Sequence, residues 1–176
     1  MAIVGFSTSN PIIPLYLRDL GITGAAELNW WTGAINALPA ITMAVFAPIW
    51  GSLADSYGRK LMLLRAMIGG SLLVGALALT NAPWQVLVLK SLQGCLTGTV
   101  AAATVLTASI VPAEEAGYRL GLLQMGVFLG NSVGPMFGGI ITDMAGSRVN
   151  FVMTAIILAS AAFIVSRRVE EQFSPG

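Results

Sequence analysis

Long apolar stretches separated by short polar breaks constrain the fold of this chain more than any other feature. Six of them lie near residues 1–17, 30–50, 61–80, 84–110, 119–141 and 150–166. A helix needs about 20 apolar residues to cross the hydrocarbon core of a bilayer, and every stretch after the first approaches or exceeds that length. The first stretch lacks the charged start and cleavage site of a signal peptide, so we expect Met1 to be a truncated or internal start. Residues 1–176 are predicted to form one all-α domain, a six-helix transmembrane bundle.

Composition excludes a soluble globular protein. Hydrophobic residues make up 56% of the chain and charged residues 10%, whereas a soluble domain carries about 25% charged residues. The net charge of +1 provides no basic surface for nucleic acid. With Cys95 as its one cysteine and with no histidine, the chain cannot form an intrachain disulfide or a cysteine metal cluster. We therefore expect the lipid bilayer as a partner, with no metal, no cofactor and no nucleic acid.

The break between the second and third stretches carries the most specific pattern. Residues 51–63 read GSLADSYGRKLML, and they place a carboxylate and two cations between flanking apolar helices. Charges cannot remain in hydrocarbon, so this loop is predicted to lie at the water boundary. The segment resembles the signature loop between the second and third helices of major facilitator superfamily transporters. That resemblance implies a gating loop formed by Gly51, Asp55, Gly58, Arg59 and Lys60.

Polar residues inside two stretches are candidates for a substrate cavity. Lys90, Gln93 and Thr97 are spaced so that one helical face carries an ammonium, an amide and a hydroxyl. A charge within a span usually faces a cavity or a partner, although Lys90 could instead extend to the headgroups at its helix end. The stretch resembles the fourth-helix motif of the same family, which has arginine where Lys90 stands. Asn10, followed by two prolines, is either a substrate contact or a buried amide beside a simple kink.

A glycine ridge marks the fifth stretch. Glycines recur every four residues, and such a ridge allows another helix to approach to backbone contact. The pattern resembles the fifth-helix motif of the drug:proton antiporter branch, which lies against the opposite half of the transporter. Generic packing within the bundle is the alternative. The residues assigned to interdomain packing are Gly126, Gly130, Gly134, Pro135, Gly138 and Gly139.

The ridge also contains a formal match to a serine-hydrolase motif. Residues 130–134 read GNSVG, but the nucleophile of such an enzyme needs a strand-to-helix turn and a base that accepts its proton. Here the serine is predicted to lie within a helix, and the chain has no histidine. We therefore predict no catalytic residues and no enzyme.

Lysine and arginine are unevenly distributed between the breaks, which predicts the orientation of the chain. If residues 51–60 and 111–118 form cytoplasmic loops, the opposite side carries only Arg18 and Arg148, and Lys90 lies within a span. The cytoplasmic side then carries Arg59, Lys60, Arg65, Arg119, Arg167 and Arg168.

Together, the motifs resemble the amino-terminal half of a twelve-span drug:proton antiporter in the plasma (inner) membrane. The resemblance implies alternating access, export of small amphipathic molecules, a proton gradient as the energy source and a missing carboxy-terminal half as partner. No aspartate or glutamate falls in the middle of a predicted span, so coupling to protons rests on the resemblance alone. The alternative is a six-span subunit that does not transport and that dimerises or binds a partner through its glycine ridge.

Overall fold

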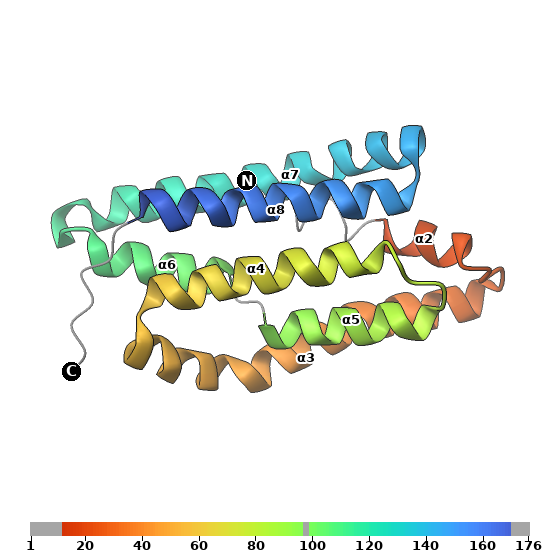
Figure 1. Ribbon diagram of the computed structural model, residues 1–176, viewed down its shortest axis with the longest axis horizontal. Coiled ribbons are helices and arrows are strands. Elements are labelled where there is room, and N and C mark those ends of the chain that lie inside the picture. Colours follow the sequence, from red (N-terminus) through yellow and green to blue (C-terminus); the bar gives the residue numbers. More distant parts are fainter. Residues whose placement is uncertain (1–11, 97–98, 170–176) are drawn as a thin grey trace.

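The computed structural model describes residues 12–96 and 99–169, and all regular secondary structure in these ranges is helical. The prediction of an all-α bundle is confirmed. The helices are α2 (Ile13–Asp19), α3 (Ala25–Tyr57), α4 (Arg59–Leu77), α5 (Pro83–Leu96), α6 (Thr99–Ile110), α7 (Ala113–Ala145) and α8 (Ser147–Arg168). Figure 1 shows that α3, α4, α7 and α8 run along the long axis of the molecule.

Five stretches of the described chain are long and apolar enough to cross a membrane: Ala25–Tyr57, Arg59–Leu77, Pro83–Ile110, Ala113–Ala145 and Ser147–Arg168. They contain the predicted stretches from residue 30 onward, apart from the end of 61–80, and several extend further. With 33 residues, α3 and α7 are each about 50 Å long, whereas the hydrocarbon core is about 30 Å thick. The ends of these helices therefore reach beyond the hydrocarbon. This explains why their terminal turns can contain polar residues.

The two predicted cytoplasmic loops are much shorter than expected. Residues 51–57 belong to α3, so the connection to α4 is Gly58 alone, with a φ of +96°. This left-handed backbone conformation is readily adopted by glycine and reverses the chain within one residue. In place of the loop 111–118, only Val111 and Pro112 separate α6 from α7. The charged residues of both segments lie in the terminal turns of these helices. They can therefore reach water without a loop.

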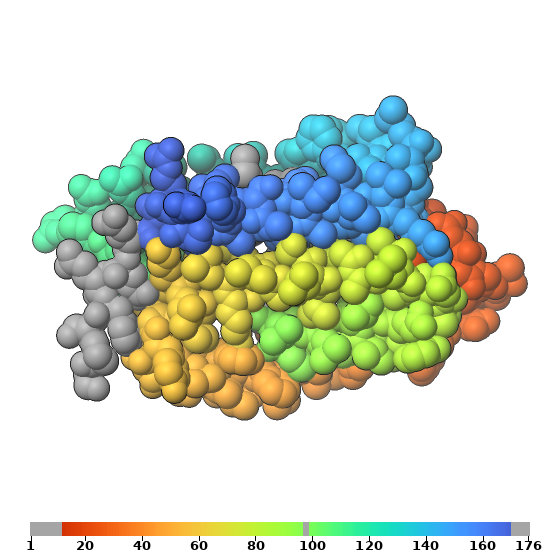
Figure 2. All heavy atoms as spheres, in the orientation of Figure 1, coloured from red at the N-terminus to blue at the C-terminus, as the bar shows by residue number. Residues whose placement is uncertain are grey.

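The bundle has two distinct ends. The Tyr16 end contains α2, the last turn of α4 and the first turn of α8, and it lies at the right of Figure 1. The Gly58 end contains the α3–α4 turn and the α6–α7 connection, at the left of the same view. Figure 2 shows α8 and α4 side by side between these ends, in agreement with their contacts.

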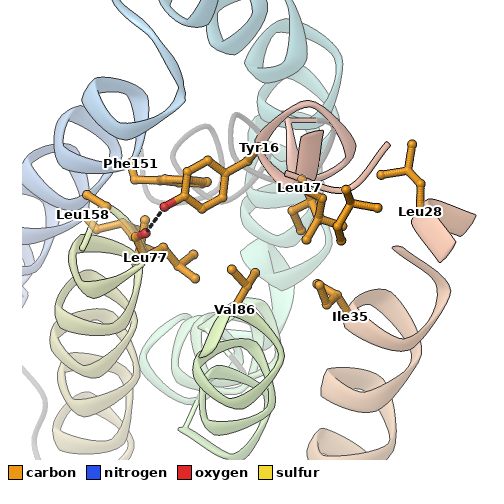
Figure 3. Close-up of a cluster of buried hydrophobic side chains, with 12 residues drawn as sticks. Tyr16, Leu17, Leu28, Ile35, Leu77, Val86, Phe151 and Leu158 are labelled. Carbon is orange, nitrogen blue, oxygen red and sulfur yellow. Dashed lines mark hydrogen bonds between the residues drawn. The ribbon is translucent and has the colours of Figure 1, made fainter. Parts of the chain in front are cut away.

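The larger buried apolar cluster lies at the Tyr16 end. It joins α2, α3, α4, α5 and α8, and Figure 3 shows how side chains from these helices point toward one another. Its buried members are Ile13, Tyr16, Leu17, Ile22, Leu28, Ile35, Val74, Leu77, Ala78, Val86, Phe151 and Leu158. The smaller cluster, on the Gly58 side, consists of Leu63, Met67, Leu106, Ala161 and Ala162.

Large apolar side chains also cover the outside of the bundle. Val45 of α3, Leu72 of α4, Phe128 of α7 and Phe163 of α8 are each more than 60% exposed. Exposed apolar surface of this extent is unfavourable in water but suits contact with lipid tails. The outer surface therefore agrees with a protein that spans a membrane several times.

Candidate functional site

The residues of the predicted gating loop lie at the end of α3 and the start of α4, and we call them the gating segment. Asp55 and Arg59 form an ion pair of 3.5 Å, with their side chains 72% and 34% exposed. Lys60 turns toward α8 instead, where its ammonium donates a hydrogen bond of 3.0 Å to the carbonyl oxygen of Ser166. Gly51 has open space where a side chain would begin. The two adjacent cations therefore contact different helices.

A cavity of about 450 Å³ opens beside the gating segment, between α3, α4 and α6. Asp55 and Arg59 contribute charged groups to its wall, and Trp50 and Arg65 contribute an aromatic ring and a second guanidinium. The remaining lining is largely methionine, alanine and valine. Charged groups and free volume thus meet at the Gly58 end.

Trp50 and Arg65 connect this cavity to the carboxyl end of α5. The guanidinium carbon of Arg65 lies 3.2 Å from the centroid of the Trp50 ring. Trp50 Nε1 donates a hydrogen bond of 2.6 Å to the carbonyl oxygen of Cys95, and Arg65 Nη2 donates one of 3.2 Å to that of Leu96. Three helices are therefore joined at one point.

The polar face predicted for the fourth stretch is partly described. Lys90 and Gln93 of α5 are buried, with exposed fractions of 4% and 7%, and both take part in interactions inside the chain. Such burial places the Lys90 side chain inside the bundle, away from the outer surface. Thr97 and Asn10, the other two candidates, lie outside the described residues.

The same helix crosses α3 at very close range. A Cβ atom added to Gly94 would overlap the Thr42 hydroxyl and the Pro39 carbonyl, and it would lie 2.6 Å from Pro39 Cα. The Thr42 hydroxyl also lies within hydrogen-bonding distance of two carbonyl oxygens, at 3.0 Å from Pro39 and 3.1 Å from Ser91. The absence of a side chain at Gly94 therefore fixes how deeply α5 packs against α3.

The glycines of the α7 ridge differ in their burial. Gly130, Gly134 and Gly138 are buried within this chain. Gly126 is exposed, Gly139 and Pro135 are half-buried, and an added Cβ at Gly126 or Gly139 would meet open space. The middle of the ridge is therefore covered by other parts of this chain, whereas its first glycine is exposed. Its assignment to interdomain packing stays a prediction.

Sequence reasoning missed two residues at the junction with α5. Arg65 entered the sequence argument only as a cytoplasmic charge, and Trp50 did not enter it. An arginine within a span is costly in lipid, and this was the signal that could have identified Arg65 as a residue with a specific partner. No group of three or more His, Cys, Asp or Glu side chains in the described ranges could hold a metal ion.

Comparison with known proteins gives consistent matches over almost the whole chain. The Major Facilitator Superfamily model matches residues 1–175. Multidrug resistance protein MdtG of Proteus mirabilis is 39% identical over 171 residues, which is 97% of this chain and 42% of that protein. The Escherichia coli K12 protein of the same name is 39% identical over 170 residues, with the same coverage. The chain therefore spans less than half the length of these relatives.

Proposed function

This chain belongs to the Major Facilitator Superfamily, and on that premise we propose that it forms the amino-terminal half of a proton-coupled exporter of small amphipathic molecules. The observation that carries this proposal is the match to multidrug resistance proteins over 97% of this chain but only 42% of their length. A carboxy-terminal half would supply the other wall of the transport path, as in transporters built from two pseudo-symmetric halves. Alternating access would then open the path to one side at a time.

The buried polar face of α5 supports a role in substrate handling. Ionisable residues inside membrane spans are costly, and they commonly mark a pathway for substrate or ions. Lys90 and Gln93 lie within the bundle on one face of α5. We assign them, together with Thr97 and Asn10, to the wall of the substrate path.

The Gly58 end supports a role in gating. The exposed Asp55–Arg59 pair contributes only about 0–1 kcal/mol to stability, so it can break and re-form during a transport cycle. The adjacent cavity of about 450 Å³ gives the gating segment space to move. We place this end in the cytoplasm of a cell bounded by the plasma (inner) membrane, following the bias of lysine and arginine.

The proton-carrying group is expected in the second half. Within the described ranges, every aspartate and glutamate lies in or beside the terminal turns of a helix: Asp19, Glu27, Asp55, Glu114, Glu115 and Asp143. A carboxylate at mid-membrane would therefore come from the carboxy-terminal half. Lys90 would contribute a positive charge to the shared path.

Efflux by the full-length protein, with this chain as its amino-terminal half, tests the proposal. Proteoliposomes loaded with a fluorescent amphipathic cation should lose it when a proton gradient is imposed. Lys90→Ala should lower the initial rate about tenfold, whereas Lys90→Arg, which keeps the charge, should retain most of it. Arg168→Ala, on the exposed end of α8, serves as the control.

Two outcomes would contradict the proposal. Wild-type flux by Lys90→Ala at equal protein abundance would remove Lys90 from the substrate path. Absence of gradient-driven flux in the unmodified full-length protein, for a panel of amphipathic cations, would favour the non-transporting subunit that binds a partner through the glycine ridge.

A further inference from the structure

The carboxyl end of α5 is held by side chains from two other helices. Cys95 and Leu96 are the last residues of α5 in the described part of the chain, and residues 97–98, which follow them, lie outside it. Trp50 of α3 donates to the carbonyl oxygen of Cys95 at 2.6 Å, and Arg65 of α4 donates to that of Leu96 at 3.2 Å. These two hydrogen bonds restrict how far Cys95 and Leu96 can move relative to α3 and α4.

The two donor side chains, Trp50 and Arg65, also contact each other. The guanidinium carbon of Arg65 lies over the Trp50 ring, 3.2 Å from the ring centroid. While the guanidinium contacts the ring, its Nη2 donates to the carbonyl oxygen of Leu96. Within the described part of the chain, Nε and Nη1 of Arg65 are buried and make no hydrogen bond, so the ring and Leu96 are its specific contacts. A lysine ammonium cannot stack in this way while donating from its edge.

These residues lie on the same helices as the gating segment. Trp50 directly precedes Gly51 on α3, and Arg65 follows Arg59 by six residues on α4, an axial distance of about 9 Å. All four line the cavity at the Gly58 end. A tilt of the α3–α4 turn therefore moves Trp50 and Arg65 as well, and the cavity provides the space for that tilt.

Trp50 and Arg65 bind to α5, the helix that also carries Lys90 and Gln93. Lys90 precedes Leu96 by six residues on α5, again about 9 Å along the helix axis. The packing of α5 against Pro39 and Thr42 of α3 leaves no room for an added Cβ at Gly94, so α5 can turn about this contact but cannot slide along α3 there. Movement at the end of α5 is thus transmitted to its buried polar face.

We propose that Trp50 and Arg65 are positioning residues that form a clamp between the gating segment and α5, through which gate movement shifts Lys90 and Gln93. The functional part of this inference rests on the proposed transport function. The clamp itself is a physical contact, and its effect on the end of α5 can be measured without transport.

The first experiment reads the clamp through Cys95, the single cysteine of this chain, which is half-buried. The full-length protein in membranes is alkylated with a maleimide, and the rate at Cys95 is followed by peptide mass spectrometry and normalised to the unfolded protein. Trp50→Phe and Arg65→Gln should each raise that rate about tenfold, because each removes a hydrogen bond that holds Cys95 or Leu96 in place. Arg65→Lys should give a smaller increase.

A matched control exists on α8. Arg167 lies over the Phe163 ring, with its guanidinium carbon 5.4 Å from the centroid, and both side chains are exposed. Arg167→Gln removes a similar cation–π contact and should leave alkylation of Cys95 unchanged. Wild-type alkylation rates in both Trp50→Phe and Arg65→Gln would overturn the clamp.

The second experiment tests coupling to the gate. In the efflux assay, Arg65→Gln should lower the maximal rate about tenfold with little change in KM, because α5 keeps its polar face but no longer follows the gate. The double variant Lys90→Ala/Arg65→Gln should be no slower than the slower single variant, since Arg65 acts by positioning the helix that carries Lys90.

The outcomes separate the clamp from the proposed function. Multiplicative losses in the double variant, or a raised KM with an unchanged maximal rate for Arg65→Gln, would overturn the coupling. If the unmodified full-length protein transports nothing, the proposed function and the coupling fail together, whereas alkylation of Cys95 still decides whether the clamp exists.

Discussion

The two ends of the bundle differ in how their helices are held together. At the Tyr16 end, the Tyr16 hydroxyl lies 3.0 Å from the Leu77 carbonyl oxygen and 2.9 Å from that of Thr80, and the ring packs edge-on against Phe151. At the Gly58 end, the α3–α4 turn borders a cavity of about 450 Å³. One end is closed by interlocked side chains, and the other retains space beside its charged groups.

The polar contacts at the two ends also differ in their exposure and in the helices that they join. Near the Tyr16 end, Ser147 donates to Asp19 at 3.0 Å and Arg148 to Asn81 at 2.8 Å, so α8 is tied to α2 and to the α4–α5 turn. At the Gly58 end, an exposed hydrogen bond of 3.0 Å from Lys60 to the Ser166 carbonyl oxygen joins α4 to α8, whereas Glu115 and Arg119 pair at 3.1 Å within a single helix and are more than half exposed. Contacts between helices resist movement, whereas an exposed pair within one helix does not. We infer that the Gly58 end is the part of this half that rearranges.

The largest expected difference is in the cost of truncating an apolar side chain at each end. Phe151→Ala should lower the free energy of unfolding by about 3–5 kcal/mol, because it leaves a void in a fully buried cluster. Met62→Ala should cost about 1 kcal/mol or less, because Met62 is half-buried and already borders the cavity. Unfolding in mixed micelles with increasing SDS measures both. Equal losses would remove the distinction between the ends.

A second comparison follows α7, which runs from one end to the other. Gly134→Leu should destabilise the protein by about 1–3 kcal/mol, because Gly134 is buried inside this half. Gly126→Leu should change stability by less than about 0.5 kcal/mol, because open space surrounds that position. The same SDS titration compares the two variants. Unchanged stability of Gly134→Leu together with loss of transport would assign the middle of the ridge to the second half.

A hydroxyl deletion gives a smaller effect at the closed end. Tyr16→Phe should cost about 1–2 kcal/mol, since the hydroxyl is buried and removing it leaves carbonyl oxygens without this donor. Tyr118→Phe, at the Gly58 end, should be nearly neutral because Tyr118 is 70% exposed. Thermal unfolding of the purified variants checks the pair. The closed-end account fails if Tyr16→Phe is as stable as Tyr118→Phe.

The smallest expected effect on stability accompanies a large effect on transport. Asp55→Asn should change the free energy of unfolding by less than about 1 kcal/mol, because the Asp55–Arg59 pair is exposed. We nevertheless expect this variant to stop efflux by the full-length protein. The lost carboxylate is the group that we propose holds the gate in one of its states. Glu115→Gln removes a similar exposed pair and should transport normally. Normal efflux by Asp55→Asn at matched abundance would argue against a gate.

The sequence was sufficient to predict the fold class, because runs of apolar residues this long leave few alternatives to membrane-spanning helices. Helix boundaries were harder to predict. Hydropathy reports which residues avoid water, whereas residues 51–57 remain helical because backbone hydrogen bonding continues past the apolar stretch.

Contacts between helices were not predictable from spacing. The Tyr16 hydroxyl binds backbone carbonyl groups more than 60 positions away, and Trp50 and Arg65 bind carbonyl groups of α5 that are 45 and 31 positions away. Every residue has a backbone carbonyl, so no residue type marks the partner. Gly94 had no part in the sequence prediction, because the close approach of α3 that requires a glycine there is visible only in three dimensions.

Hydrogen exchange tests the difference between the two ends most directly. The full-length protein, reconstituted in nanodiscs, is exchanged with and without an amphipathic cation, and backbone deuterium uptake is followed peptide by peptide. Peptides from residues 51–62 should change their uptake on substrate binding, whereas peptides from 147–158 should not. A substrate-dependent change at the Tyr16 end that equals or exceeds the change at the Gly58 end would contradict the account.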